Sequence, residues 1–343
     1  MVFKVISALL CNISDYSIES IQKFTKGIAA HSLNLENLLL TLGDVPYIEG
    51  DPFTTLDYFE NLFRSKFPRL KCLILKYMIS YAVLPRTYKR FCPFFFDYLC
   101  RNADNLQHLE LCLRESKIYK DQLNAIKNVI NANISTLKHL EIDLCDDDTI
   151  HSPLNIFSED LCLESARDLI YLKSNVEIDS KNLNILASKL SKGLENLQYL
   201  ELYFHFYYVK DGGFPRLVPE LFEDVCKVIR ATVENHNLKI LKVKLSFLLD
   251  KIKDNYLDIL RESLRLKIQD LDYLELLLES RSLISQNSAR NLTYALKEMK
   301  TEGQIVIYNS SKKYDYYNWV IKKEDVDVDD KLRKFSYAKN ADE

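Results

Sequence analysis

The side chains best suited to metal binding or nucleophilic catalysis in this sequence are its 8 cysteines and 6 histidines. No two cysteines stand in a CxxC pair, so zinc-finger spacing is missing. Cys72, His108 and His139 are the sharpest candidates, because each occupies the third place of a recurring segment and these segments would be successive strands. One thiolate and two imidazoles need a fourth ligand to hold zinc, and the nearby positions offer only carboxylates such as Glu110. We therefore favour surface or partner-contacting histidines and expect no bound metal.

Catalytic motifs are missing from the sequence. A cysteine beside a histidine can in principle act as a nucleophile with its base, but with 8 cysteines and 6 histidines some pairs arise by accident. The chain has only 7 glycines, and neither GxGxxG nor GxxxxGK[ST] occurs, which argues against glycine-rich phosphate loops. The run Asp146-Asp147-Asp148 lacks EF-hand spacing and indicates a solvated turn rather than a calcium site. We expect a protein that is not an enzyme and uses no cofactor.

Charge and composition exclude further classes of partner. The 343 residues are 47% hydrophobic and 28% charged, as in an ordinary soluble protein, and the formal net charge is -3. That balance gives no global reason to bind nucleic acid or an anionic membrane. No run approaches the roughly 18 uninterrupted apolar residues that cross a bilayer. The scattered cysteines are typical of reduced, buried side chains, so we expect a cytoplasmic protein, with the nucleus as the alternative.

One segment recurs along most of the chain and would position these side chains. It has eight places, with a large apolar residue at the first, fourth, sixth and eighth. Its recurrence in phase predicts a repeat architecture rather than an accident of composition. A degenerate copy at 169–176 would fill the long step between 137–144 and 197–204. The seven clear copies are 35–42, 70–77, 106–113, 137–144, 197–204, 238–245 and 271–278.

The spacing within the segment predicts a strand. Places four, six and eight are two residues apart, so they point to one side and bury one edge, while places five and seven point to the other. Such short strands become stable when neighbouring copies stack. Apolar residues at spacings of three and four predict a helical return between the strands, and strand, helix and parallel strand together predict a right-handed coil. The helices are predicted at 54–66, 117–132, 180–194, 219–233, 250–266 and 288–300.

The copies resemble leucine-rich repeats, L-x-x-L-x-L followed by a helical return, across roughly residues 30 to 310. The long, irregular units are most similar to the repeat halves of fungal F-box proteins, the substrate receptors of cullin-RING ubiquitin ligases. The resemblance implies an α/β fold, a solenoid or horseshoe with a parallel sheet on its concave face and helices on its convex face. Two features depart from the family. Of the ninth places only Cys145 has the usual Asn or Cys, and residues 1–34 show no recognisable F-box, which we interpret as lost or truncated.

In this architecture the side chains at places three, five and seven form a ladder on the concave face, where a protein ligand would dock. The middle of the ladder is acidic and its late part basic, with tyrosines between, and tyrosine is common among interface hot spots. We expect a protein or peptide ligand with a basic segment, and from the resemblance a ubiquitin-ligase adaptor. The alternative is a free-standing repeat scaffold or binding protein unrelated to ubiquitin. The candidate partner-binding residues are His108, Glu110, His139, Glu141, Asp143, Tyr199, Glu201, Tyr203, Lys242, Lys244, Tyr273 and Glu275.

An open solenoid requires atypical units at its ends. We expect an N-terminal cap at 1–34 with a helix beginning near residue 14, the repeat solenoid at 35–310, and a C-terminal cap with a flexible charged tail at 311–343. The apolar start at 2–11 is interpreted as a buried element or the cut edge of a longer product, not as a signal peptide. A last strand is predicted at 304–308, with Trp319 and nearby tyrosines covering its edge.

Overall fold

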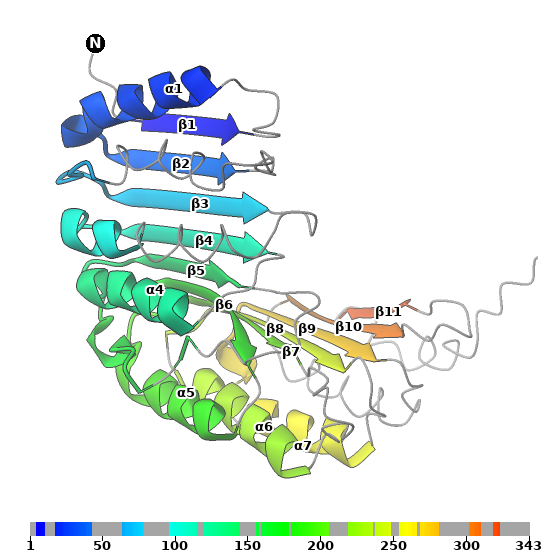
Figure 1. Ribbon diagram of the computed structural model, residues 1–343. Helices are drawn as coiled ribbons and strands as arrows, with labels where there is room; N and C mark the ends of the chain where they lie inside the picture. The colour runs from blue at the N-terminus through cyan, green and yellow to red at the C-terminus, as the bar shows by residue number, and fades with distance from the viewer. Residues whose placement is uncertain are drawn as a thin grey trace, which may run out of the picture. The chain divides into compact units, whose positions relative to one another are not determined.

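A computed structural model describes much of the chain, which divides into two compact units, Met1–Asn175 and Val176–Glu343. Both units are α/β, with parallel strands and helices (Figure 1). None of the described helices is long and apolar enough to cross a bilayer. The described residues are 5–10, 18–42, 64–78, 96–114, 120–144, 156–157, 159–177, 180–205, 219–235, 237–247, 254–265, 268–280, 302–309 and 318–322.

The first unit is built on strands that pair in parallel and in chain order from β1 to β6. The helix α1 (Ile18–His31) and the short 3-10 helix η2 (Ser32–Asn34) precede the second strand, and α4 (Lys120–Asn133) precedes the fifth. A second 3-10 helix, η3 (Leu163–Ser165), leads into β6. The strands are β1 (Val5–Leu10), β2 (Asn37–Leu42), β3 (Cys72–Met78), β4 (His108–Arg114), β5 (His139–Asp143) and β6 (Tyr171–Glu177), the last of which reaches the boundary of the unit.

The second unit continues the alternation of helix and strand. Its strands β7 to β10 pair in parallel, and β11 closes the series antiparallel to β10. The helices α5, α6 and α7 lie side by side (Figure 1). In chain order the elements are α5 (Ser180–Gly193), β7 (Tyr199–His205), α6 (Pro219–Val233), β8 (Ile240–Phe247), α7 (Asp254–Arg265), the 3-10 helix η4 (Ile268–Asp270), β9 (Tyr273–Ser280), β10 (Glu302–Asn309) and β11 (Asn318–Lys322).

The strand register aligns equivalent places of the recurring segment. In the first unit the fourth-place leucines of β2 to β6 stand opposite one another, and in the second unit those of β7 to β9 do the same. All of them are at most 2% exposed, as are the first-place leucines. The predicted parallel strands are therefore confirmed, and their leucines form the core together with apolar side chains of the helices. Burial of each such leucine stabilises the fold by about 1.5–3 kcal/mol.

A shared backbone contact marks the start of these strands. Lys71 N–H and Cys72 N–H both donate to the carbonyl of Glu36, at 2.8 and 3.1 Å. The carbonyl of Lys71 in turn accepts hydrogen bonds from the N–H groups of Gln107 and His108. The same arrangement recurs before β5, β6, β8 and β9, always between the second and third places of one strand and the second place of its neighbour. One carbonyl thus anchors each following strand, which fixes the register.

Asparagines at helix ends satisfy backbone groups of the preceding coil in both units. Asn133, the buried last residue of α4, accepts a hydrogen bond from Leu106 N–H at 2.9 Å and donates to the carbonyls of Ala103 and Val129, both at 3.0 Å. In the second unit Asn235 follows α6 and donates to the carbonyl of Leu194 at 2.7 Å. These two asparagines therefore tie their coils to the preceding ones.

Four of the six predicted helices are confirmed, whereas residues 64–66, the described end of the prediction at 54–66, are not helical. The prediction at 219–233 coincides with α6, and those at 117–132, 180–194 and 250–266 correspond to α4, α5 and α7. The prediction at 288–300 and most of that at 54–66 lie outside the described residues, as do the Asp146 to Asp148 run and the charged tail beyond residue 322.

The segments predicted to close the two ends of the repeat region both contain strands. The apolar start of the chain contains β1, which pairs with β2, and the described part of the expected helix is α1, from Ile18 onward. The last predicted strand is β10, and Trp319 of β11 stands opposite Ile307 of β10. The tyrosines at 314, 316 and 317 lie outside the described residues.

Candidate functional site

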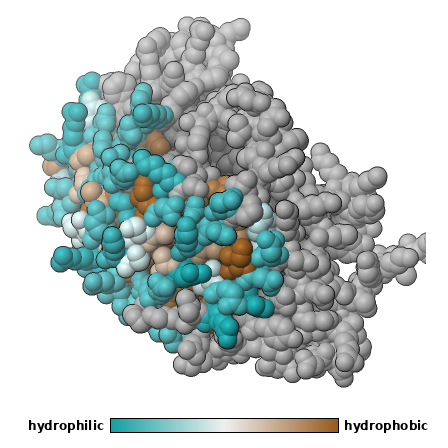
Figure 2. Space-filling view, turned by 90° about the horizontal axis from the view of Figure 1, so that it is seen from below, coloured by the Kyte–Doolittle hydropathy of each residue, from teal (hydrophilic) through white to brown (hydrophobic). Residues whose placement is uncertain are grey.

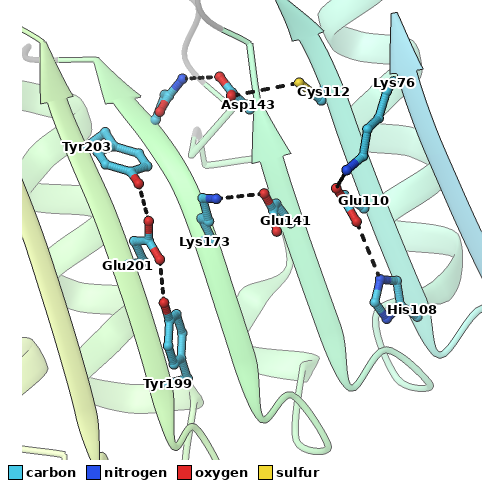
Figure 3. Close-up of polar contacts among 11 residues, drawn as sticks. Lys76, His108, Glu110, Cys112, Glu141, Asp143, Lys173, Tyr199, Glu201 and Tyr203 are labelled. Atoms are coloured by element: carbon cyan, nitrogen blue, oxygen red, sulfur yellow. Dashed lines mark hydrogen bonds and ion pairs between the residues drawn. The ribbon is translucent and has the colours of Figure 1, made fainter. Parts of the chain in front are cut away.

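The side chains at places three, five and seven lie on one face of the strands, and we call this surface the polar face of each unit. In the first unit it combines rings, acids and lysines that come from four neighbouring strands (Figure 3). From β3 to β6 its rows are Cys72, His108, His139 and Tyr171 at place three, Ile74, Glu110, Glu141 and Lys173 at place five, and Lys76, Cys112, Asp143 and Asn175 at place seven.

Three aromatic rings stack along the third-place row of the first unit. The ring centroids of His108 and His139 are 3.9 Å apart with planes within 5°, and those of His139 and Tyr171 are 3.9 Å apart within 6°. Burial lowers the pKa of His108, and burial together with the neighbouring His108 lowers the pKa of His139 to about 4. Both imidazoles are therefore neutral at pH 7.

The register places Cys72, His108 and His139 side by side, as the sequence predicts. The two imidazoles, however, stack face to face, so their nitrogen lone pairs lie in parallel planes and do not converge on one point. In the described part of the chain no three Cys, His, Asp or Glu side chains are grouped to hold a metal ion. The third-place row therefore has the geometry of an aromatic stack.

The glutamates of the first unit are compensated by lysines that flank them. Glu110 and Glu141 stand directly opposite each other on β4 and β5. Lys76 on β3 contacts Glu110 at 2.8 Å, and Lys173 on β6 contacts Glu141 at 2.8 Å. The hydrogen bond to Glu110 raises the pKa of Lys76. The acidic middle predicted for the ladder is therefore largely neutralised within the protein itself.

Asp143 is less accessible than its place in the ladder predicts. Its residue is only 7% exposed, because the neighbours in the seventh-place row cover it. Asn175 donates to one carboxylate oxygen at 2.7 Å, and the thiol of Cys112 points to the other at 3.9 Å. Asp143 therefore organises the polar face more than it contributes surface to it.

In the second unit the polar face is built around a carboxylate held by two phenols. Tyr199 and Tyr203 lie two residues before and after Glu201 on β7, on the same side of the strand, and each donates its hydroxyl to a different oxygen of Glu201 (Figure 3). Glu201 is 7% exposed. The two phenols therefore shield its charge, which the sequence had suggested as an open anionic contact.

The lysines of β8 lie near tyrosine rings of the adjacent strands. Lys242 lies between two of them, because its Nζ is 5.8 Å from the ring centroid of Tyr199 and 5.9 Å from that of Tyr273. Lys244 Nζ lies 5.9 Å from the centroid of the Tyr203 ring. All three distances fall within the range of cation–π attraction. These lysines are thus held over aromatic rings rather than projecting alone.

The acids of β9 complete this arrangement. Lys242 contacts Glu275 at 3.8 Å and Lys244 contacts Glu279 at 3.7 Å, both longer than the ion pairs of the first unit. Tyr273 donates to Glu275 at 2.9 Å, and burial together with this carboxylate raises the pKa of Tyr273 to about 12. Ser246 donates to Glu279 at 3.0 Å. Both residues occupy ninth places, so this serine–glutamate hydrogen bond joins the ninth places of β8 and β9.

Sequence reasoning missed several members of the polar face. Tyr171, Lys173 and Asn175 belong to the degenerate copy, whose third, fifth and seventh places were not used as candidates. Glu279 follows the last place of its segment and lies outside the places that predicted the ladder, yet it contacts Lys244 and Ser246. The signal that could have found the first three was the register of the copy at 169–176, which places them opposite His139, Glu141 and Asp143.

Outside the polar face, the described surface offers little apolar area. Seen from the side on which α5, α6 and α7 lie, the described residues are mainly hydrophilic, with small hydrophobic areas (Figure 2). The large apolar side chains exposed among the described residues, Val5, Leu33 and Ile170, come from different elements. An extended apolar patch, the usual mark of a hydrophobic interface, is not found in this part of the molecule.

The sequence matches no family model and no curated protein. The polar face is therefore interpreted from its own geometry, which combines ordered rings, cross-strand ion pairs and half-buried polar groups.

Proposed function

We propose that the chain is a non-enzymatic protein-interaction module, a horseshoe-type solenoid whose strand–helix coils resemble leucine-rich repeats and whose polar face binds a protein or peptide ligand. The recurring segment, the in-register leucines and the shared carbonyl at strand starts support the solenoid. We place this module in the cytoplasm, as the scattered cysteines predict.

One observation carries the binding proposal. The aromatic side chains of the polar face are held in fixed positions by stacking and by hydrogen bonds to carboxylates, as in the stack of His108, His139 and Tyr171 and the pair of phenols on Glu201. Ordered rings lose little conformational entropy when a ligand docks, which favours affinity. Aromatic side chains flanked by charges are also the composition of interface hot spots.

Site-specific photo-crosslinking tests the proposal. A photoreactive phenylalanine analogue would replace Glu141 on the polar face or, as the matched control, Ser188 on the exposed side of α5. Peptides selected for binding from a random display library are expected to crosslink from position 141 and not from position 188. Crosslinking from position 188 alone would contradict the proposal, because the ligand would then bind the helices.

The resemblance to F-box proteins adds a more specific form of the proposal, in which the ligand is a substrate delivered to a cullin-RING ubiquitin ligase. Co-purification of the full chain with a cullin-RING adaptor would support this receptor role. Failure to associate would favour the free-standing binding protein, and the polar face would serve that role equally.

A further inference from the structure

The aromatic stack of the first unit ends at His108, because the next position of the third-place row, on β3, is a cysteine. His139 covers the face of His108 that points toward β5. On the opposite side, toward β3, the next residue in the third-place row is Cys72, whose side chain is small and half-exposed. A planar group of the ligand could therefore add to the stack above Cys72, at the spacing the strands already impose.

The groups next to this ring favour a cation. Glu110 lies beside His108, and its Oε2 is 4.0 Å from His108 Nε2, while Lys76 holds the other carboxylate oxygen. The first-unit polar face carries three carboxylates, on Glu110, Glu141 and Asp143, against the two ammonium groups of Lys76 and Lys173. Together these five groups carry a net charge of -1. Both imidazoles are neutral, so they do not repel a positive ligand.

We propose that Cys72, His108 and Glu110 form a subsite for an arginine side chain of the ligand. Its guanidinium would lie flat on the face of His108 that points toward β3, above Cys72, and would donate to Oε2 of Glu110. Arginine fits better than lysine because its guanidinium is planar, weakly hydrated and able to stack and donate at once. This inference rests on the proposed function and names the chemistry of the ligand.

Peptides selected from a random display library against the full chain test the inference. We expect the bound peptides to share an arginine, and replacement of that arginine by lysine to weaken binding about tenfold. Nα-acetylarginine amide should compete with the peptide at lower concentration than Nα-acetyllysine amide. Fluorescence anisotropy of the labelled peptide gives the dissociation constants.

Variants of the chain locate the effect. E110Q removes the acceptor charge and C72F fills the space against the His108 ring, and each should weaken peptide binding about tenfold. H108F keeps a ring at the end of the stack and should change binding by less than about threefold. E223Q, at an exposed position of α6 outside the polar face, is the matched control and should leave binding unchanged. Circular dichroism establishes that each variant is folded, and C72F tests the subsite even if E110Q is unstable.

The outcomes separate this inference from the proposed function. If peptides crosslink to position 141 but bind equally well to E110Q and C72F, or equally well with lysine, the arginine subsite is wrong and the binding function stands. If no selected peptide crosslinks to the polar face, both the subsite and the proposed function are wrong.

Discussion

Glu110 and Glu141 stand directly opposite each other on adjacent parallel strands, and each carboxylate is held at 2.8 Å by a lysine from the strand on its far side. Like charges opposite each other destabilise a strand pair. The lysines offset this repulsion, so the four side chains form two adjacent ion pairs, in the order lysine, glutamate, glutamate and lysine across β3 to β6.

Removal of Lys173 should expose this repulsion. We expect K173M to lower the free energy of unfolding by about 1 kcal/mol, because Glu141 would face Glu110 without its counter-charge. The double variant K173M/E141Q should regain most of the loss. Urea denaturation at low and at 1 M salt measures the effect, which salt should reduce. K227M on α6 is the control, because its ion pair with Asp224 lies within one helix and should matter less. If the free energy of unfolding of K173M equals that of the unsubstituted protein, the ion pair of Lys173 and Glu141 contributes nothing to stability.

The stacked histidines predict an acid-sensitive stability. Histidine in the unfolded chain takes up a proton near pH 6.5, whereas in the folded chain the pKa of His139 is about 4. Between these pH values the unfolded state binds more protons than the folded state, so the free energy of unfolding falls as pH decreases from 6.5 to 4. Above pH 6.5 the histidine is neutral in both states and causes no destabilisation. H139F keeps a ring in the stack and should reduce the slope of melting temperature against pH in that window. Equal slopes for both proteins would contradict the assignment.

The side chain of Asn133 should be one of the costliest to remove. N133A would remove the side-chain partner of Leu106 N–H and of the Ala103 carbonyl in a buried region. Since an unsatisfied buried group costs about 1–3 kcal/mol, we expect a loss of about 3 kcal/mol in the free energy of unfolding. N124A, at an exposed position of the same helix, is the control and should change stability by less than about 0.5 kcal/mol. Similar losses for both would rule out the special role of Asn133.

The two phenols on Glu201 should stabilise the fold, because both donate hydrogen bonds to a buried carboxylate. Y199F/Y203F removes both donors, so we expect a loss of about 2–3 kcal/mol in the free energy of unfolding at pH 7. Urea denaturation at pH 7 measures the loss. Y273F, which removes one donor from the half-buried Glu275, should cost less. A cost for Y273F equal to that of the double variant would contradict this explanation.

The positions of strands and of several helices could be predicted from the sequence because the signals are local and recurrent. A period of two with leucine at fixed places predicted strands such as β5 and β9, and the same spacing revealed β6 in its degenerate copy. The prediction at 219–233 coincided with α6 because its apolar stripe is unbroken.

The electrostatics of the polar face could not be predicted in the same way. Reading each strand alone made Glu110, Glu141 and Glu201 look like open acids, because the groups that neutralise them either lie on other strands or depend on side-chain rotamers. Lys173 in particular lies in a copy that lacks the clear leucine pattern. The role of Asn133 also escaped prediction, since its partners Ala103 and Leu106 are about one coil away in sequence.

The doubly accepting carbonyl at the strand starts has a consequence for how such a chain tolerates insertions. Lys71, Gln107 and Lys138 each fix the next strand at its first residues, upstream of the rest of that strand. Extra residues added to a connecting segment can therefore bulge outward without shifting the alignment of the strands on either side. Peptide tags or reporter loops placed in those connections should leave the stacked rows intact, which makes the connections natural points for engineering new surface onto this scaffold.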